Sequence, residues 1–226
     1  MQKAWRIFKR ILIVLFISHI AYIFFCKWFN PPITLTQTGS VLQGYGLKRD
    51  YVNLNEMSSH IKLAVMASED QLFPEHSGFD MKSIEKAIKF NEKHPNRRRG
   101  ASTISQQVAK NVFLWQGGGF IRKGLEAYFT FMIESLWSKK RILEMYLNVA
   151  EMGKGIFGIE AAARAFYSKS AKDLSRSEAA KIAASLPNPK LYTVKPISRK
   201  VAQRYDDIMR QMNNIEGDKE IQALIR

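Results

Sequence analysis

The sequence is poor in cysteine, in acidic residues and in paired histidines, and each shortage removes a class of site. The single cysteine, Cys26, excludes an intramolecular disulfide and a cysteine-rich zinc site. The four histidines lack the spacing of three or four residues that a helical metal site uses, so we expect no structural metal. With 20 Asp and Glu against 35 Lys and Arg, the net charge of +15 predicts anionic partners: nucleic acid, acidic lipid headgroups or phosphorylated ligands.

Glycine and proline are also modest in number, which argues against a fibrous or disordered chain. The 226 residues correspond to roughly one or two domains and can bury one sizeable core.

A long apolar run lies near the N-terminus. Positions 11–26 read ILIVLFISHIAYIFFC, and apolar residues resume at 28–29, which approaches the ~20 residues of a membrane helix. Lys27 alone follows the run, whereas four basic residues precede it: Lys3, Arg6, Lys9 and Arg10. The positive-inside rule therefore predicts a cytoplasmic segment 1–10, a transmembrane signal anchor at 11–29 and an external remainder. A cleaved signal peptide is the alternative, but it needs small residues where IFFCKWFNPP has bulky ones.

The external part divides into a short connection and one domain. Residues 30–46 are rich in Pro, Thr, Gln and Gly without a sustained helical period, which is typical of a tether. Residues 47–226 form the predicted domain, and beyond position 29 the net charge is still +10. Its pattern is mainly helical, with only weak strand candidates near 41–54. Side-chain oxygens suited to capping precede five predicted helices, at Ser58 or Ser59, Asp80, Ser102, Ser138 and Ser175.

Two adjacent carboxylates, Glu69 and Asp70, follow an apolar helix and precede the irregular stretch QLFPEHSGFD. Such pairs are usually solvated surface, so the pair alone does not indicate catalysis. A second candidate feature is the polar helix face in GASTISQQVAKNVFL (100–114), which carries Thr103, Gln107, Lys110 and Asn111. A helix that begins with Gly and Ser and carries a lysine suits an anionic ligand, although a merely exposed polar face is the simpler explanation.

Taken in order, four motifs resemble the family 51 glycosyltransferases, the peptidoglycan polymerases found alone or fused to penicillin-binding domains. The resemblance covers about residues 44–192 and is greatest to the monofunctional biosynthetic members of Gram-negative bacteria. Its motifs are EDQLFPEHSGFD (69–80), GASTISQQVAKNVFL (100–114), RKGLEA (122–127) and SKKRILEMYLNVAEMGKGIFGIEAAA (138–163). The chain departs from the family in the loop 116–119, which lacks the basic residue that members often carry, and at Lys86, near which many have Arg.

The resemblance implies a mainly α, lysozyme-like domain and assigns roles to its residues. Glu69 corresponds to the general base, Glu126 to a second essential carboxylate and Lys110 to the lysine that helps to hold the donor diphosphate. We expect Asp70 to support Glu69, and His76 to fix the following loop by hydrogen bonds. The full set of expected substrate-binding residues is Asp70, Thr103, Gln106, Gln107, Lys110, Asn111, Arg122 and Lys123.

The implied reaction polymerises lipid II, a lipid-linked disaccharide-peptide, into β-1,4-linked glycan strands with inversion at the anomeric carbon and release of undecaprenyl pyrophosphate. No cofactor is required by this chemistry, although a divalent cation such as Mg or Mn could assist the departing diphosphate. The expected partners are lipid II, the lipid-linked strand, inner-membrane lipids and proteins of cell-wall synthesis and division, with no nucleic acid. The catalytic domain is expected in the periplasm, on the outer face of the inner membrane.

Two other functions are compatible with parts of the sequence. A lysozyme-like enzyme that cleaves glycan, either a lytic transglycosylase or a muramidase, would share the fold but would not need a diphosphate site. A membrane-tethered nucleic-acid-binding or scaffold protein would use the basic surplus and the run Arg97–Arg99, but the external location argues against it. The apolar residues Phe120, Ile121, Phe129, Phe131, Met132, Ile133 and Trp137 are predicted to lie in the core, with a membrane-facing groove as the alternative.

Overall fold

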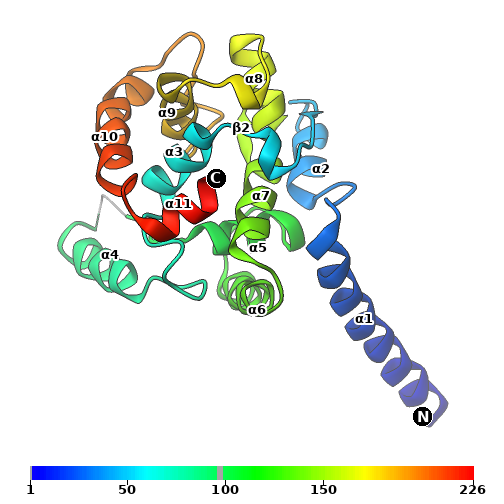
Figure 1. The fold of residues 1–226 in the computed structure, drawn as a ribbon. Coiled ribbons are helices and arrows are strands. Elements are labelled where there is room, and N and C mark those ends of the chain that lie inside the picture. The colour runs from blue at the N-terminus through cyan, green and yellow to red at the C-terminus, as the bar shows by residue number, and fades with distance from the viewer. Residues whose placement is uncertain (1, 96–98) are drawn as a thin grey trace.

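The computed structural model describes residues 2–95 and 99–226, and helices dominate it, as the sequence predicts (Figure 1). The helices are α1 (Gln2–Trp28), α2 (Leu35–Leu42), α3 (Ser59–Glu69), α4 (Met81–Lys93), α5 (Ile104–Phe113), α6 (Phe120–Leu136), α7 (Lys139–Val149), α8 (Ile159–Tyr167), α9 (Arg176–Ser185), α10 (Arg199–Ile215) and α11 (Lys219–Ile225), with short 3-10 turns at Leu54–Glu56 and Ala171–Asp173. The strands are β1 (Lys48–Arg49), β2 (Glu151–Gly153) and β3 (Ile156–Phe157).

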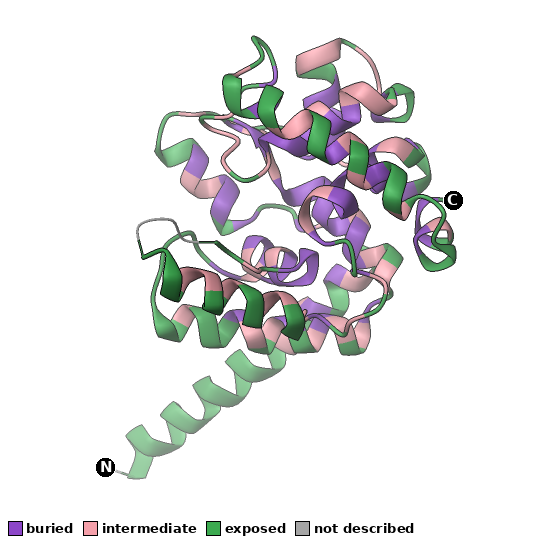
Figure 2. Ribbon diagram, turned by 90° about the vertical axis from the view of Figure 1, so that its left-hand side faces the viewer, coloured by how far each residue is buried: buried purple, intermediate pink, exposed green. Residues whose placement is uncertain are grey.

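Helix α1 projects away from the rest of the molecule and is exposed along most of its length (Figures 1 and 2). It is long and apolar enough to cross a membrane. The helix includes the predicted anchor up to Trp28 and most of the basic segment 1–10 that precedes it. Exposing so many apolar side chains to water is unfavourable. The length, composition and exposure of α1 are therefore consistent with a single-pass membrane anchor.

The connection between the anchor and the domain is folded, so the prediction of an irregular tether is wrong for its central part. Helix α2 begins with a capping box in which Thr34 Oγ1 accepts a hydrogen bond from the Gln37 backbone amide and Gln37 Oε1 accepts one from the Thr34 backbone amide. The end of α1 is bound as well. Trp137 Nε1 donates to the carbonyl of Ile23 at 3.1 Å, and Arg141 Nη2 donates to the carbonyl of Cys26 at 2.9 Å. The bond to Cys26 satisfies a carbonyl in the last turn of α1, and the two bonds together fix the direction of the helix relative to the domain.

The core forms around α3, which is buried on nearly every side (Figure 2). Helices α9 and α10 pack against α3, and α5 packs against α6 and α7. Seven consecutive residues of α3, 61–67, are buried, among them Lys62, whose Nζ donates to the Ile225 carbonyl at 3.0 Å, and the helix carries its final residue, Glu69, from the core to the cleft. The central helix therefore gives the candidate base a rigid support.

Four predicted caps are confirmed, at Ser58, Asp80, Ser138 and Ser175. The fifth lies one residue later than predicted, because Thr103, not Ser102, forms a capping box with Gln106. The short sheet was not predicted beyond a weak candidate at β1; its strand order is β1-β3-β2, with β1 parallel and β2 antiparallel to β3. Gly155, at φ +71°, is required there, because a Cβ would lie 2.1 Å from the Tyr45 carbonyl oxygen.

The apolar stretch on α6 divides between the core and the surface. Ile133 and Trp137 are buried, as predicted. Phe120, Ile121 and Phe131 are 99%, 81% and 62% exposed, so the prediction of a core position is wrong for these three. Their exposure agrees with the membrane-facing alternative, which the sequence pattern could not separate from burial.

Candidate active site

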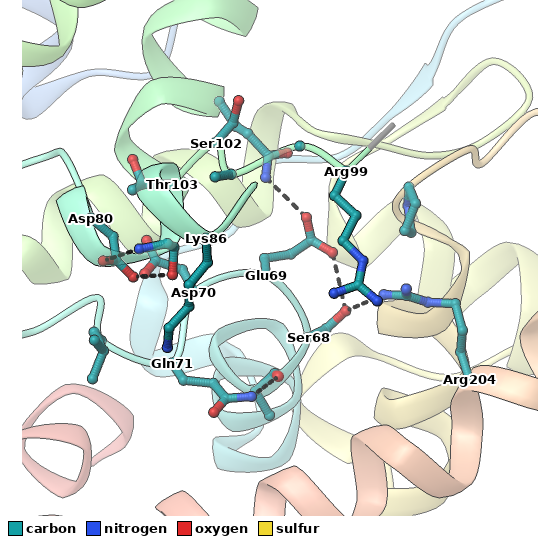
Figure 3. A pocket seen from close by; sticks show the side chains of 17 residues that line it. Ser68, Glu69, Asp70, Gln71, Asp80, Lys86, Arg99, Ser102, Thr103 and Arg204 are labelled. Carbon is teal, nitrogen blue, oxygen red and sulfur yellow. Dashed lines mark hydrogen bonds between the residues drawn. The ribbon is translucent and has the colours of Figure 1, made fainter. Parts of the chain in front are cut away.

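A cleft with a volume of about 850 Å³ surrounds the end of α3 (Figure 3). Its walls come from α3, α4, the segment 99–103, α5 and α10, which are far apart in the sequence. The charged and polar side chains that line it are Ser68, Glu69, Asp70, Gln71, Asp80, Ser83, Lys86, Arg99, Ser102, Thr103, Gln107 and Arg204.

Glu69 lies half-buried at the cleft, with both carboxylate oxygens bonded. Gln107 Nε2 donates to Oε2 at 2.9 Å, and Ser68 Oγ donates to Oε1 at 3.1 Å. Glu69 stands at the C-terminal end of α3, where the helix dipole disfavours a negative charge, so these donors compensate an unfavourable position. Two hydrogen bonds restrict the carboxylate orientation while its edge remains accessible from the cleft, which is the geometry a general base requires.

Both oxygens of the neighbouring carboxylate, Asp70, bond to groups of the protein. Its side chain is 3% exposed; Oδ2 accepts from the Ile104 amide at 2.9 Å, and Oδ1 lies 2.9 Å from His76 Nε2. The Gly78 amide donates to His76 Nδ1 at 3.1 Å, so Nε2 carries the proton and donates to Asp70. The expectation that His76 fixes the loop is confirmed. Asp70 thereby joins the end of α3 to the start of α5.

The polar residues at the start of α5 and along it have three different environments. Thr103 and Gln106 are buried and use their side chains in the capping box, and Thr103 Oγ1 also donates to the Gly78 carbonyl at 2.7 Å. Gln107 faces Glu69. Asn111 is also buried and accepts from Gln116 Nε2 at 3.3 Å. The helix therefore brings Gln107 to the carboxylate and uses Thr103 and Gln106 for its own start.

A second charged cluster lies on α6. Glu126 is buried, with its side chain 4% exposed, and accepts from Arg122 Nη1 at 2.7 Å and from Lys123 Nζ. Arg122 Nε is buried without a hydrogen-bond partner among the described residues. Each Glu126 oxygen is thus bonded to one cation, which fixes the orientation of the carboxylate toward Arg122 and Lys123. Within residues 2–95 and 99–226, no group of three or more His, Cys, Asp and Glu side chains is placed to hold a metal ion.

Lys110 lies between the two carboxylate sites. Burial lowers the pKa of the Lys110 ammonium below that of an ordinary lysine, Glu126 and Glu69 act in the opposite direction, and Arg122 and Lys123 lower it further. Its Nζ has no hydrogen-bond or ion-pair partner within the described parts of the chain. A half-buried ammonium without such a partner, close to the cations Arg122 and Lys123, is suited to a ligand with more than one negative charge.

Three cationic side chains in the cleft were not predicted as site residues: Lys86, Arg99 and Arg204. They come from α4, from the segment after the undescribed residues 96–98, and from α10. In the run Arg97–Arg99, whose charge suits nucleic acid, Arg97 and Arg98 lie outside the described residues, and Arg99 reaches the cleft (Figure 3). No local motif connects these three positions. The only signal in the sequence was Lys86, near which many members of the resembled family carry Arg.

This mainly helical domain places a hydrogen-bonded carboxylate in a cation-lined cleft, the features of a candidate enzyme site, and follows a helix apolar enough to cross a membrane. The family model for transglycosylases matches residues 36–213, so the chain belongs to the transglycosylase family. Proteins named biosynthetic peptidoglycan transglycosylase are similar to it over most of both lengths. The relative from Mannheimia succiniciproducens is 56% identical over 76% of this chain and 70% of its own, that from Escherichia coli 54% over 84% and 80%, and that from Haemophilus influenzae 46% over 95% and 89%.

Proposed function

We propose that this protein polymerises peptidoglycan glycan strands from lipid II, with Glu69 as the general base. The chain is a peptidoglycan glycosyltransferase, as its family and its relatives' names indicate. The observation that carries the assignment of the base is the placement of Glu69, held by Ser68 and Gln107 at the edge of the cleft. The word biosynthetic in the relatives' names favours strand formation over the lytic alternative.

In the proposed step, the 4-hydroxyl of the incoming lipid-linked disaccharide attacks the anomeric carbon of the growing strand. The new carbon–oxygen bond forms as the bond to the diphosphate breaks, the hydroxyl proton passes to Glu69, and the electron pair leaves with the polyprenyl diphosphate. A positioned carboxylate that accepts this proton contributes ~100-fold to 10,000-fold to the rate. Attack from the face opposite the leaving group inverts the anomeric centre.

The cluster on α5 and α6 is the proposed site for the departing diphosphate. Lys110, Arg122 and Lys123 supply positive charge where negative charge develops, and preorganised charge of this kind lowers the barrier. Glu126 holds Arg122 and Lys123 in position through its two carboxylate oxygens. Its proposed role is to orient these cations without contact with the sugar. Of the remaining expected binding residues, Asp70 and Thr103 line the cleft from buried positions, whereas Gln106 and Asn111 are buried outside its lining.

The anchor and the exposed part of α6 would place the site at a membrane surface. Both substrates are lipids, so an enzyme confined to the same bilayer meets them at a raised effective concentration. The four basic residues before the anchor favour a cytoplasmic N-terminus and a periplasmic domain. Phe120 and Ile121 would contact the lipid acyl region near the diphosphate cluster, since Arg122 and Lys123 follow them directly on α6.

A polymerisation assay tests this function. Purified full-length protein in detergent is expected to convert lipid II into polymer that lysozyme digests, with the release of one undecaprenyl diphosphate per bond. The same preparation should release no soluble sugar from purified cell wall. Sugar release without polymer would favour the lytic enzyme, and salt-sensitive DNA binding without polymer would favour the nucleic-acid-binding protein. Parallel reactions with and without a chelator determine whether a divalent ion contributes.

The lowered pKa of Lys110 predicts a limit on activity at alkaline pH. If its ammonium stabilises the diphosphate, kcat/KM should fall as pH rises through that pKa, at a lower pH than the ~10.4 of an exposed lysine. Lys110→Arg keeps its charge at this pH and should extend the active range upward. The measurement is kcat/KM for both proteins between about pH 7 and about pH 10.

The sign of the stability effect separates this limit from unfolding. A lysine whose pKa is lowered in the folded state favours folding increasingly as pH rises above that pKa, because the folded protein then releases its proton more readily than the unfolded chain. Deprotonation of Lys110 should therefore not unfold the enzyme, and thermal unfolding across the same pH range checks this. Parallel loss of activity in wild type and Lys110→Arg would show that another group sets the limit.

A further inference from the structure

Arg204 on α10 reaches the proposed base through one hydroxyl group. Its Nη2 donates to Ser68 Oγ at 3.1 Å, and Ser68 Oγ donates to Glu69 Oε1 at 3.1 Å (Figure 3). Ser68 precedes Glu69 on α3, whereas Arg204 follows it by more than 130 positions and comes from a helix packed against α3 and α9. The fold thus brings a C-terminal arginine to the carboxylate on which the proposed reaction depends.

The donor and acceptor capacities of the three groups give this chain of bonds a direction. A guanidinium can only donate, so Ser68 Oγ must accept from Arg204 with a lone pair. Its single proton is then directed to the other side, where Glu69 Oε1 lies at 3.1 Å and the Ala183 carbonyl at 3.3 Å. The bond from Arg204 occupies one of the two lone pairs of Ser68 Oγ and thereby favours the orientation in which Ser68 donates to the base.

A stabilising ion pair does not account for the position of Arg204. Its Nε is buried without a hydrogen-bond partner, and no acidic side chain pairs with it in residues 2–95 and 99–226. A buried unpaired N–H group costs ~1–3 kcal/mol, which a purely structural arginine would recover through a carboxylate. The helix that carries it is fixed nearby, since Tyr205 Oη donates to Ser177 Oγ on α9 at 3.0 Å.

We propose that Arg204 is a positioning residue, which fixes the Glu69 carboxylate through Ser68 while Gln107 holds the opposite oxygen. The inference depends on the proposed role of Glu69 as the base. With Oε1 bonded to Ser68 and Oε2 to Gln107, the carboxylate cannot rotate about its terminal bond without losing both hydrogen bonds. Loss of the arginine leaves Ser68 free to turn its proton to Ala183 alone, which releases one side of the base.

The test compares Arg204→Ala, Ser68→Ala and the double variant in steady-state polymerisation of lipid II. A misplacement of about 1 Å in a reacting group costs up to about 100-fold, so each single variant should lose about 10- to 100-fold in kcat, with KM changed less than about twofold. Because both residues act through the same bond, the double variant should be no slower than the slower single variant. Methylguanidinium added to Arg204→Ala should restore part of kcat, and Arg204→Lys should retain more activity than Arg204→Ala.

The matched control is Arg210→Ala on the same helix, where Arg210 pairs with Asp207 and both side chains are well exposed. It should match wild type, and thermal unfolding of all variants identifies losses due to instability. Ser68→Ala, which removes one oxygen atom, tests the same bond if Arg204→Ala does not fold. The proposal would be overturned if the loss of kcat in the double variant equalled the product of the two single losses, or if the variants showed a raised KM with unchanged kcat. Wild-type kcat in both single variants would also overturn it while leaving Glu69 in place, whereas absence of polymer with the wild-type enzyme would reject the function itself.

Discussion

Replacing Glu69 by Gln is expected to reduce kcat for polymerisation by at least about 100-fold, and by up to about 10,000-fold. The amide cannot accept the proton of the incoming hydroxyl, so the attack loses its base. The substitution should leave the local structure intact. Gln107 can still donate to the remaining carbonyl oxygen, and Ser68 can turn its proton fully to Ala183 while it accepts from the new amide group. The measurement is turnover of lipid II under saturating conditions, together with thermal unfolding.

The control for this variant is Glu216→Gln, a distant carboxylate that pairs with Arg176 at the surface. Exposed pairs of this kind contribute little to stability, so the control should retain wild-type kcat and nearly the same unfolding temperature. Binding of lipid II should be similar in wild type and Glu69→Gln, because the base acts in the transition state and contributes little to ground-state affinity. Residual activity within about tenfold of wild type would exclude Glu69 as the base.

The sequence predicts most of the helical framework because its signals are local. Ser58, Ser138 and Ser175 each start the helix expected of them, and the apolar run of α3 correctly indicates a helix leading to Glu69. Helix α2 was missed because its stability depends on burial of Thr36, Gln37 and Ser40, and not on an apolar pattern. The strands β2 and β3 were missed because two or three residues are too short to show alternation.

Contacts within the candidate site could be predicted from the sequence only where both partners belong to the same motif. Arg122, Lys123 and Glu126 lie within a single turn or so of helix, so their contact follows from spacing alone. The contact between Gln107 and Glu69 depends on the packing of α5 near the end of α3, which no local pattern specifies. Arg204 is the extreme case, because it lies on an amphipathic helix where an arginine is expected for solubility alone.

Replacing Glu126 by Gln is expected to produce two separate losses. The variant leaves Arg122, whose side chain is 12% exposed, with a neutral partner in place of an ionised one, which should lower the free energy of unfolding by about 2 kcal/mol. It should also lower kcat by about 100-fold or more, because Arg122 and Lys123 are no longer held against the departing diphosphate. The measurements are denaturant unfolding and steady-state polymerisation of the same protein sample.

A second buried glutamate on α6 allows the two losses to be separated. Glu134 is 8% exposed and bonds to Lys139 at 2.8 Å and to Ser105, outside the cleft lining. Glu134→Gln should therefore reproduce the loss of stability without the loss of kcat. If Glu126 acts by orienting Arg122, the Arg122→Met variant should be about as slow as Glu126→Gln, and combining the two should cost little more. If the losses of kcat instead multiply in the combined variant, Glu126 must act on the substrate directly. Equal kcat in Glu126→Gln and Glu134→Gln would confine the role of Glu126 to the stability of α6.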